Sequence, residues 1–224
     1  MDFRGLFKAT SYTEQARDVI KHLIFNGTYE PGDKLKEAEL SLSLGISRSP
    51  VREAIQSLAN DGLVRLAPQR GAFVSSFGLE ETKEIYEVRE ALEVVAARLA
   101  AVRADSEHLD KLKGVLEETR ATLERGELVA YPLDLDFHQE ISSLTRNRKL
   151  AEAISGINTQ LQLARLKSAS KPGRAREAYE EHIAIFQAIE EQAPEKAAEA
   201  MRTHLGNSLE SMMETFDGKE TGVA

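Results

Sequence analysis

The feature that most constrains the fold of this chain is an apolar periodicity that runs through residues 80–216. Apolar residues recur there at every third or fourth position, which places them on one face of an α-helix. The first such stripe consists of Ile85, Val88, Leu92, Val95 and Leu99. Further helices are predicted at 106–125, with Ser106 as the N-cap, and at 130–144, 147–168, 174–192 and 195–216. Helices of this kind, with no strand candidate among them, predict an antiparallel six-helix bundle.

Residues 1–76 follow a different pattern. Ser11 and Glu14 form a capping box before a helix that is predicted to bury Ala16, Val19, Ile20, Leu23 and Ile24. A short helix over 36–44 ends at Gly45, and after a tight turn another helix runs to Asp61. Two short strands, 63–66 and 72–75, are then joined by a turn that contains proline and glycine. This order predicts a winged helix-turn-helix with a small β-hairpin as its wing.

The fold class is therefore predicted to be mainly α, with two domains. We expect the winged helix-turn-helix in residues 1–76, a linker in 77–79, the helical bundle in 80–216 and a disordered tail in 217–224.

Composition narrows the class of protein further. The chain has 224 residues and no cysteine, which excludes disulfides, thiolate metal sites and cysteine nucleophiles. No segment approaches the ~18–20 apolar residues that span a bilayer, and the N-terminus lacks a signal-peptide core. We therefore expect a soluble, cytoplasmic protein with no membrane partner.

The net charge of −8 is distributed unevenly. Residues 1–76 carry 10 Lys and Arg against 9 Asp and Glu, whereas residues 77–224 carry 19 against 28. Only the first part is suited to approach a polyanion such as DNA.

Residues 46–58 have the composition of a DNA recognition helix. Its predicted buried face consists of Val51, Ala54, Ile55 and Leu58. Arg48, Ser49 and Arg52 lie elsewhere on the helix, where arginine can bond both acceptors of a guanine edge and serine suits phosphate. Arg70 and Gly71 place a cation at the hairpin tip, beside a residue that allows close backbone approach. Each cation alone is better explained as solvated surface charge, but the ordered set favours DNA binding.

The stretch 31–74 closely resembles the DNA-binding domain of the GntR superfamily of bacterial transcription regulators. The resemblance rests on the segments PGxxL, SRSPVREAI, DGLV and RGAFV. It implies that the residues in contact with DNA are Ser47, Arg48, Ser49, Pro50, Arg52, Arg70 and Gly71. One departure is Ala38, which stands where some members carry an arginine, so a contact from that position is absent here.

Three of the five histidines lie on the apolar faces of predicted helices. These are His138, His182 and His204, and Asp134 lies one turn before His138 on the same face. Three imidazoles and one carboxylate that point inward would form a site for a divalent transition metal. Hydrogen-bonded core histidines are the alternative, and periodicity alone does not decide between the two.

The segments 86–101, 134–154, 181–192 and 200–209 resemble the FCD effector domain of the FadR subfamily. Six helices rather than seven point to its VanR-type branch. The resemblance implies that Asp134, His138, His182 and His204 bind a metal, with zinc expected first and nickel or manganese as alternatives. It also implies that Arg89 holds a carboxylate of the effector. An intrahelical ion pair of Arg89 with Glu93 or Glu90 is an equal alternative.

Together these features predict a homodimeric transcriptional repressor that binds a palindromic operator and is controlled by a small organic acid. One alternative is a metal-dependent enzyme with an appended winged helix. Glu140, the only nearby carboxylate without an evident partner, is turned away from His138, so a placed acid or base is lacking. The other alternative is an architectural DNA-binding protein with a purely structural metal.

Overall fold

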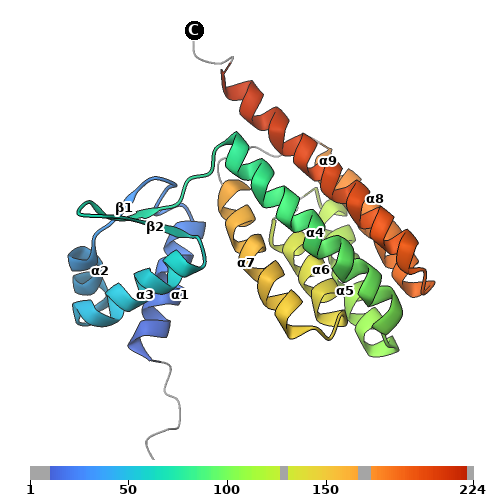
Figure 1. Cartoon of the computed structure of the whole chain (residues 1–224), viewed down its shortest axis with the longest axis horizontal. Helices are drawn as coiled ribbons and strands as arrows, with labels where there is room; N and C mark the ends of the chain where they lie inside the picture. The colour runs from blue at the N-terminus through green and yellow to red at the C-terminus, as the bar shows by residue number, and fades with distance from the viewer. Residues whose placement is uncertain (1–10, 127–130, 166–172, 221–224) are drawn as a thin grey trace, which may run out of the picture. The chain divides into compact units, whose positions relative to one another are not determined.

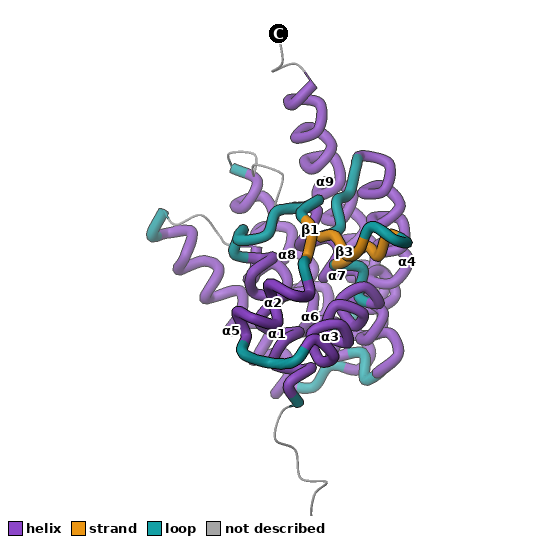
Figure 2. The backbone as a smooth tube through the Cα atoms, turned by 90° about the vertical axis from the view of Figure 1, so that its left-hand side faces the viewer, coloured by secondary structure: helices purple, strands orange, loops and turns teal. Residues whose placement is uncertain are grey.

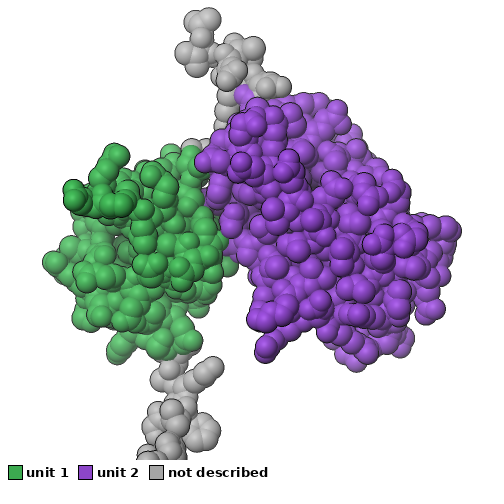
Figure 3. All heavy atoms as spheres, in the orientation of Figure 1, with its two compact units in different colours: residues 1–76 green, residues 77–224 purple. Residues whose placement is uncertain are grey.

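A computed structural model describes residues 11–126, 131–165 and 173–220, except for the side chains of 131–135, 215 and 217–220. The chain forms two compact units, Met1–Ser76 and Phe77–Ala224 (Figure 3). Every strand in the described part of the chain belongs to the first unit (Figure 2).

The first unit is the winged helix-turn-helix that the sequence predicts. Its helices are α1 (Tyr12–Phe25), α2 (Glu37–Leu44) and α3 (Arg48–Asn60). Its antiparallel sheet has the order β1-β3-β2 and consists of β1 (Lys34–Leu35), β2 (Val64–Ala67) and β3 (Gly71–Val74). The strand β1 was not predicted, because two residues are too few to show an alternating pattern.

Local signals position the helices of this unit. The Ser11 hydroxyl accepts a hydrogen bond from the Glu14 amide at 3.1 Å, so the predicted capping box is present. Gly45 ends α2 in the left-handed conformation, with φ of 66°, which a residue without Cβ adopts at little cost. The turn after it leads directly into α3, whose N-cap is Ser47.

The buried face of α3 agrees with the prediction, and that of α1 agrees in part. The face of α3 is as predicted, with Val51, Ala54, Ile55 and Leu58 buried. In α1 the prediction was wrong for Val19, which is exposed, and Leu23 is only half-buried. The buried residues Ala16, Ile20 and Ile24 are spaced by four, so Val19 lies off their stripe.

The second unit is a bundle of six helices within the described residues (Figure 1). They are α4 (Leu79–Arg103), α5 (Ser106–Glu124), α6 (Tyr131–Leu144), α7 (Arg148–Arg165), α8 (Arg174–Glu190) and α9 (Pro194–Glu220). α9 packs along α4 and α8 packs along α9. A large apolar cluster includes Phe137, Ile141 and Ile185, and a smaller one includes Tyr86 and Leu161.

Two predicted helix ends were wrong. The N-cap of α5 is Asp105 rather than Ser106, because the Asp105 carboxylate accepts a hydrogen bond from the His108 amide at 3.1 Å. α9 continues to Glu220, four residues into the segment predicted to be a disordered tail. Residues 166–168, predicted to end the fourth helix of the bundle, lie outside the described residues.

The predicted apolar stripe of α4 was also wrong in part. Ile85 of this stripe is buried as predicted, but Val88 and Val95 are 48% and 41% exposed. In the second half of α4 the buried residues are mainly alanines, namely Ala96, Ala97, Ala100 and Ala101. Alanine lets neighbouring helices approach closely, so the packing in this part of α4 buries the alanines rather than Val95.

We predict that Ala97→Leu will lower the free energy of unfolding by about 1–3 kcal/mol, because Ala97 is fully buried and extra methylene groups would overpack the helix contact. Urea denaturation followed by circular dichroism measures this change. Ala153→Leu, at an exposed position of α7, is the matched control and should change stability by less than about 0.5 kcal/mol. Equal effects of the two substitutions would contradict the assigned burial.

Candidate DNA interface and metal centre

The predicted DNA-contacting residues of the recognition helix lie together at the start of α3. Ser47, Arg48, Ser49 and Arg52 are exposed, and Pro50 is half-buried. The amides of a first helical turn have no partner within the helix, so this end of α3 also presents backbone donors. The arrangement combines two guanidinium groups with hydroxyl and amide donors, which suits phosphate and guanine edges.

Carboxylates of the same unit hold two of these side chains. The Glu37 carboxylate accepts hydrogen bonds from Nε and Nη2 of Arg52, the latter at 2.8 Å. The Glu53 carboxylate accepts from the Ser49 hydroxyl at 3.3 Å and from the Thr13 hydroxyl at 2.9 Å. Neither carboxylate was predicted to have a role. Glu37 is fifteen residues from Arg52, so no local pattern connects the two.

The wing carries more positive charge than the sequence suggested. Phe73, on the central strand β3, lies opposite Lys34 of β1 and Arg65 of β2. The cationic groups of Lys34, Arg65 and Arg70 lie 5.8, 5.7 and 6.0 Å from the centre of the Phe73 ring. Of these three cations, only Arg70 was predicted to lie at the wing. Lys34 and Arg65 join it through the register of the strands, which the sequence does not show. Gly71 has φ of 102° beside them, a conformation that favours glycine.

In the second unit, the three predicted histidines meet in the interior. His138 of α6, His182 of α8 and His204 of α9 are buried, and each offers a ring nitrogen within 4.8 Å of the others. The Nε2 atoms of His138 and His182 lie 3.1 and 3.4 Å from Nε2 of His204. The His182 ring also stacks on Phe137, with 4.1 Å between the ring centres.

Two glutamates set the orientation of this histidine centre. Glu93 contacts Nδ1 of His138 and accepts a hydrogen bond from Nε of Arg89 at 2.7 Å. Glu181 contacts Nδ1 of His204 at 2.7 Å. An ionised carboxylate only accepts hydrogen bonds, so these two Nδ1 atoms carry the protons and the Nε2 lone pairs point toward one another.

Both glutamates are held in the ionised form. Burial alone would raise the pKa of the Glu93 carboxyl, but the charge of Arg89 and the hydrogen bonds from His138 and Arg89 outweigh burial and lower this pKa. Burial also opposes ionisation of Glu181, but hydrogen bonds from His204, Arg174 and Asn207 lower its pKa to about 2. The acceptor role of both carboxylates therefore holds at neutral pH.

The donor set fits a divalent transition metal. Two Nε2 lone pairs that face each other at 3.1 Å repel unless a proton or a metal ion lies between them. A metal ion satisfies all three nitrogens at once, and imidazole suits zinc and nickel in particular. The predicted fourth ligand, Asp134, lies on α6 one turn before His138, and its side chain is outside the described residues.

Arg89 is fully buried and pairs with Glu93, as one of the two alternatives from the sequence stated. Its guanidinium also lies 5.6 Å from the centre of the Tyr86 ring. Arg89 therefore contacts the histidine centre only indirectly in the described structure, through Glu93, which in turn contacts His138.

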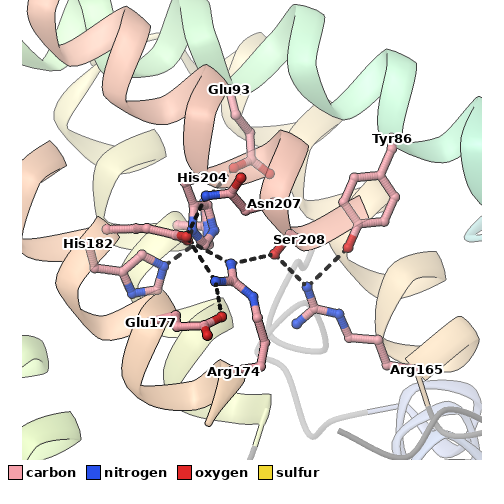
Figure 4. A network of polar contacts seen from close by, with 11 residues as sticks. Tyr86, Glu93, Arg165, Arg174, Glu177, His182, His204, Asn207 and Ser208 are labelled. Atoms are coloured by element: carbon pink, nitrogen blue, oxygen red, sulfur yellow. Dashed lines mark hydrogen bonds and ion pairs between the residues drawn. The ribbon is translucent and has the colours of Figure 1, made fainter. Parts of the chain in front are cut away.

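A second polar group lies beside the histidine centre and was missed in the sequence (Figure 4). Arg165 donates hydrogen bonds to the Tyr86 hydroxyl at 3.2 Å and to the Ser208 hydroxyl at 3.5 Å. Arg174 donates to Ser208 at 3.5 Å and holds Glu181 through both of its carboxylate oxygens. The available signal was that Ser208 lies one turn after His204, on the same inward face of α9.

The fold defines a class of protein: a DNA-binding winged helix-turn-helix joined to an all-helical domain. Two family models match the chain, "Bacterial regulatory proteins, gntR family" over residues 12–74 and the FCD domain over residues 84–207. The FCD match alone spans more than half of the 224 residues. The chain therefore belongs to the gntR family of bacterial regulatory proteins and carries an FCD domain.

Similar proteins agree with this assignment. The uncharacterized HTH-type transcriptional regulator YdhC of Bacillus subtilis (strain 168) is 32% identical over 98% of this chain and 100% of its own length. The HTH-type transcriptional repressor RspR of Escherichia coli (strain K12) is 29% identical over 88% and 84%. The structure of E. coli McbR/YncC is similar in fold, with a TM-score of 0.79 at 24% identity over 92% and 99% of the two chains.

The family and these relatives are transcriptional regulators, so the protein is a regulator and not an enzyme, and the enzyme alternative is excluded. Among the described helices, none combines the length and the apolar character that a membrane crossing requires.

We predict that Arg48→Ala and Arg52→Ala will each weaken binding to the operator by about 1–3 kcal/mol, because each removes a donor pair that suits a guanine edge. Fluorescence anisotropy with a labelled duplex measures this loss. Both residues lie outside the buried face of α3, so the thermal midpoint should not change. Arg70→Ala should weaken binding to all duplexes alike and reduce the salt dependence, as loss of a phosphate contact does. Wild-type affinity in both α3 variants would contradict the interface.

Proposed function

We propose that this regulator is a homodimeric repressor that binds a palindromic operator and is controlled by a small organic acid bound at a divalent metal ion. The observation that carries the proposal is the convergence of three buried histidine rings, two of which, His138 and His204, have their Nδ1 atoms held by carboxylates. Such an arrangement orients imidazoles for a cation and is costly to bury without one.

The proposed ligands are His138, His182 and His204, with Asp134 as the fourth, and zinc is expected before nickel or manganese. When bound, the ion would supply a Lewis acid for carboxylate oxygens, since four protein ligands leave two positions of an octahedral shell. The chain's own contribution is orientation: Glu93 and Glu181 fix the rings of His138 and His204.

The positive charge for the acid would come from the arginines around this centre. Arg89 was predicted to grip the effector, and its pairing with Glu93 favours an indirect role as a brace for His138. Arg165 lies near Ser208, one turn along α9 from His204, and is placed to attract the anion. Tyr86, Arg89 and Glu93 all belong to α4, the helix that begins just after the winged unit, so ligand binding there would act on the chain that connects the two units.

The exposed face of α4 supports dimerisation through the bundle. Val88, Val95 and Val102 recur at seven-residue intervals, with Leu92 and Leu99 half-buried between them. An exposed apolar stripe of this period is typical of a helix that packs against another helix. A two-fold axis would place the same stripe of a second copy against it and present two winged units to two half-sites. Membership of the FadR subfamily and its VanR-type branch, and a cytoplasmic location, stay predictions.

Removal of the metal should lower the thermal midpoint by a few degrees, because an ion that binds only the folded state stabilises it by mass action. Calorimetry before and after chelation, and after zinc is restored, measures this effect. His182→Ala should lose most of the metal in elemental analysis, whereas His22→Ala, an exposed histidine of α1, should retain it.

The test of effector control is calorimetric titration of organic acids into metal-loaded and metal-stripped protein. Tighter binding to the loaded form, together with weaker operator binding in its presence, is the expected result. Equal affinity of both forms would mean that the ion has a structural role. Operator binding that no acid alters would favour the architectural alternative.

For the dimer, we predict that Val95→Glu will produce monomers at micromolar concentration in sedimentation velocity, because it places a charge in the apolar stripe of α4. Lys113→Glu, on the exposed side of α5, should remain dimeric and serves as the control. A dimeric Val95→Glu variant would rule out this face of α4 as the interface.

A further inference from the structure

The winged unit contains a carboxylate at the point where an acidic group is least expected, beside the recognition helix. Glu37, the first residue of α2, accepts hydrogen bonds from Arg52 of α3 at 3.1, 3.1 and 2.8 Å. A carboxylate near the DNA surface repels phosphate, so its presence calls for a compensating role. We propose that Glu37 is a positioning residue for specificity, which holds the guanidinium of Arg52 in one orientation for reading a base.

Glu37 leaves the end of the Arg52 guanidinium that can bond a base available. A guanidinium has five N–H donors, and Glu37 engages only the side formed by Nε and Nη2. The end formed by Nη1 and Nη2 remains directed away from Glu37. That end is a two-donor fork, the form in which arginine bonds the two acceptors of guanine in the major groove.

Arg52 needs such a partner because it is otherwise unrestrained. Its side chain is 69% exposed, and among the described residues its guanidinium donates hydrogen bonds only to Glu37. A free arginine on a helix surface would lose side-chain entropy on binding and could equally reach a phosphate. The ion pair restricts the guanidinium before DNA binds, so less side-chain entropy is lost on binding.

The charge of Glu37 adds discrimination against wrong sequences. Hydrogen bonding from Arg52 lowers the pKa of Glu37, and the nearby charge of Arg48 lowers it further, so the carboxylate is ionised at neutral pH. On unrelated DNA, Arg52 gains nothing from the base edges while Glu37 still repels the backbone. This repulsion acts on every duplex alike, so discrimination comes from the ion pair, which keeps Arg52 from a phosphate contact on unrelated DNA.

The experiment compares full-length wild-type protein with E37Q, using a duplex selected from a random pool by the wild type and an unrelated duplex of equal length. E37Q should bind the unrelated duplex several-fold more tightly, with a salt slope steeper by about one, because Arg52 becomes free for phosphate. The ratio of operator to unrelated affinity should fall about tenfold. Repeated selection with E37Q should show relaxed preference at one base pair, the one at which R52A also loses preference.

The matched control is E39Q, which removes the same charge from α2 but leaves Arg52 paired, since Glu39 bonds Lys36. E39Q should change both affinities alike and leave the ratio unchanged. E37D keeps the charge but shortens the reach, so it should lower the ratio without strengthening binding to the unrelated duplex.

The double variant E37Q/R52A tests whether Glu37 acts through Arg52. In the R52A background, E37Q should have no further effect on the ratio. The proposal is overturned if E37Q keeps the wild-type ratio while its thermal midpoint is unchanged, or if E37Q lowers the ratio equally with and without Arg52. If E37Q fails to fold, E37D provides the decisive measurement.

Discussion

The helical bundle depends on a buried ion pair between two residues one turn apart on α4, Arg89 and Glu93. Removal of two charges from water costs several kcal/mol for each ion, so such a pair persists only when its partners are complete. Glu93 has a second partner in addition to Arg89, because it also contacts His138 of α6. Loss of one member would leave an uncompensated buried charge, at about 3–5 kcal/mol. The stability of the bundle and the orientation of the histidine centre therefore rest on the same contacts.

Both units use a carboxylate to orient a basic group. Glu93 and Glu181 hold one side of a histidine ring and direct its other nitrogen inward. Glu37 holds one side of Arg52 and directs the other outward. In each case the carboxylate does not itself contact the proposed ligand, which is a metal ion or a base of DNA. It restricts the orientation of the basic residue that is proposed to make that contact. This role explains acidic residues at positions where bulk charge alone would disfavour them.

Local signals in the sequence were sufficient for much of the fold. The capping box at Ser11, the turn at Gly45 and the buried face of α3 were all predicted, and so was the inward direction of the three histidines. Predictions failed where competing faces were available. On α4 the predicted stripe included Val88 and Val95, which are exposed, whereas Ala97 and Ala100 are buried, because close helix packing favours small side chains.

What the sequence by itself determined is the set of helices, their order and the residue types that point inward, because caps and periodicity depend on neighbours within a few positions. What only the tertiary structure decided is which side chains meet. Glu37 and Arg52 are fifteen residues apart, and Glu181 and His204 are twenty-three apart. No local pattern specifies such pairs, since they form only when the packing of whole helices brings one face against another.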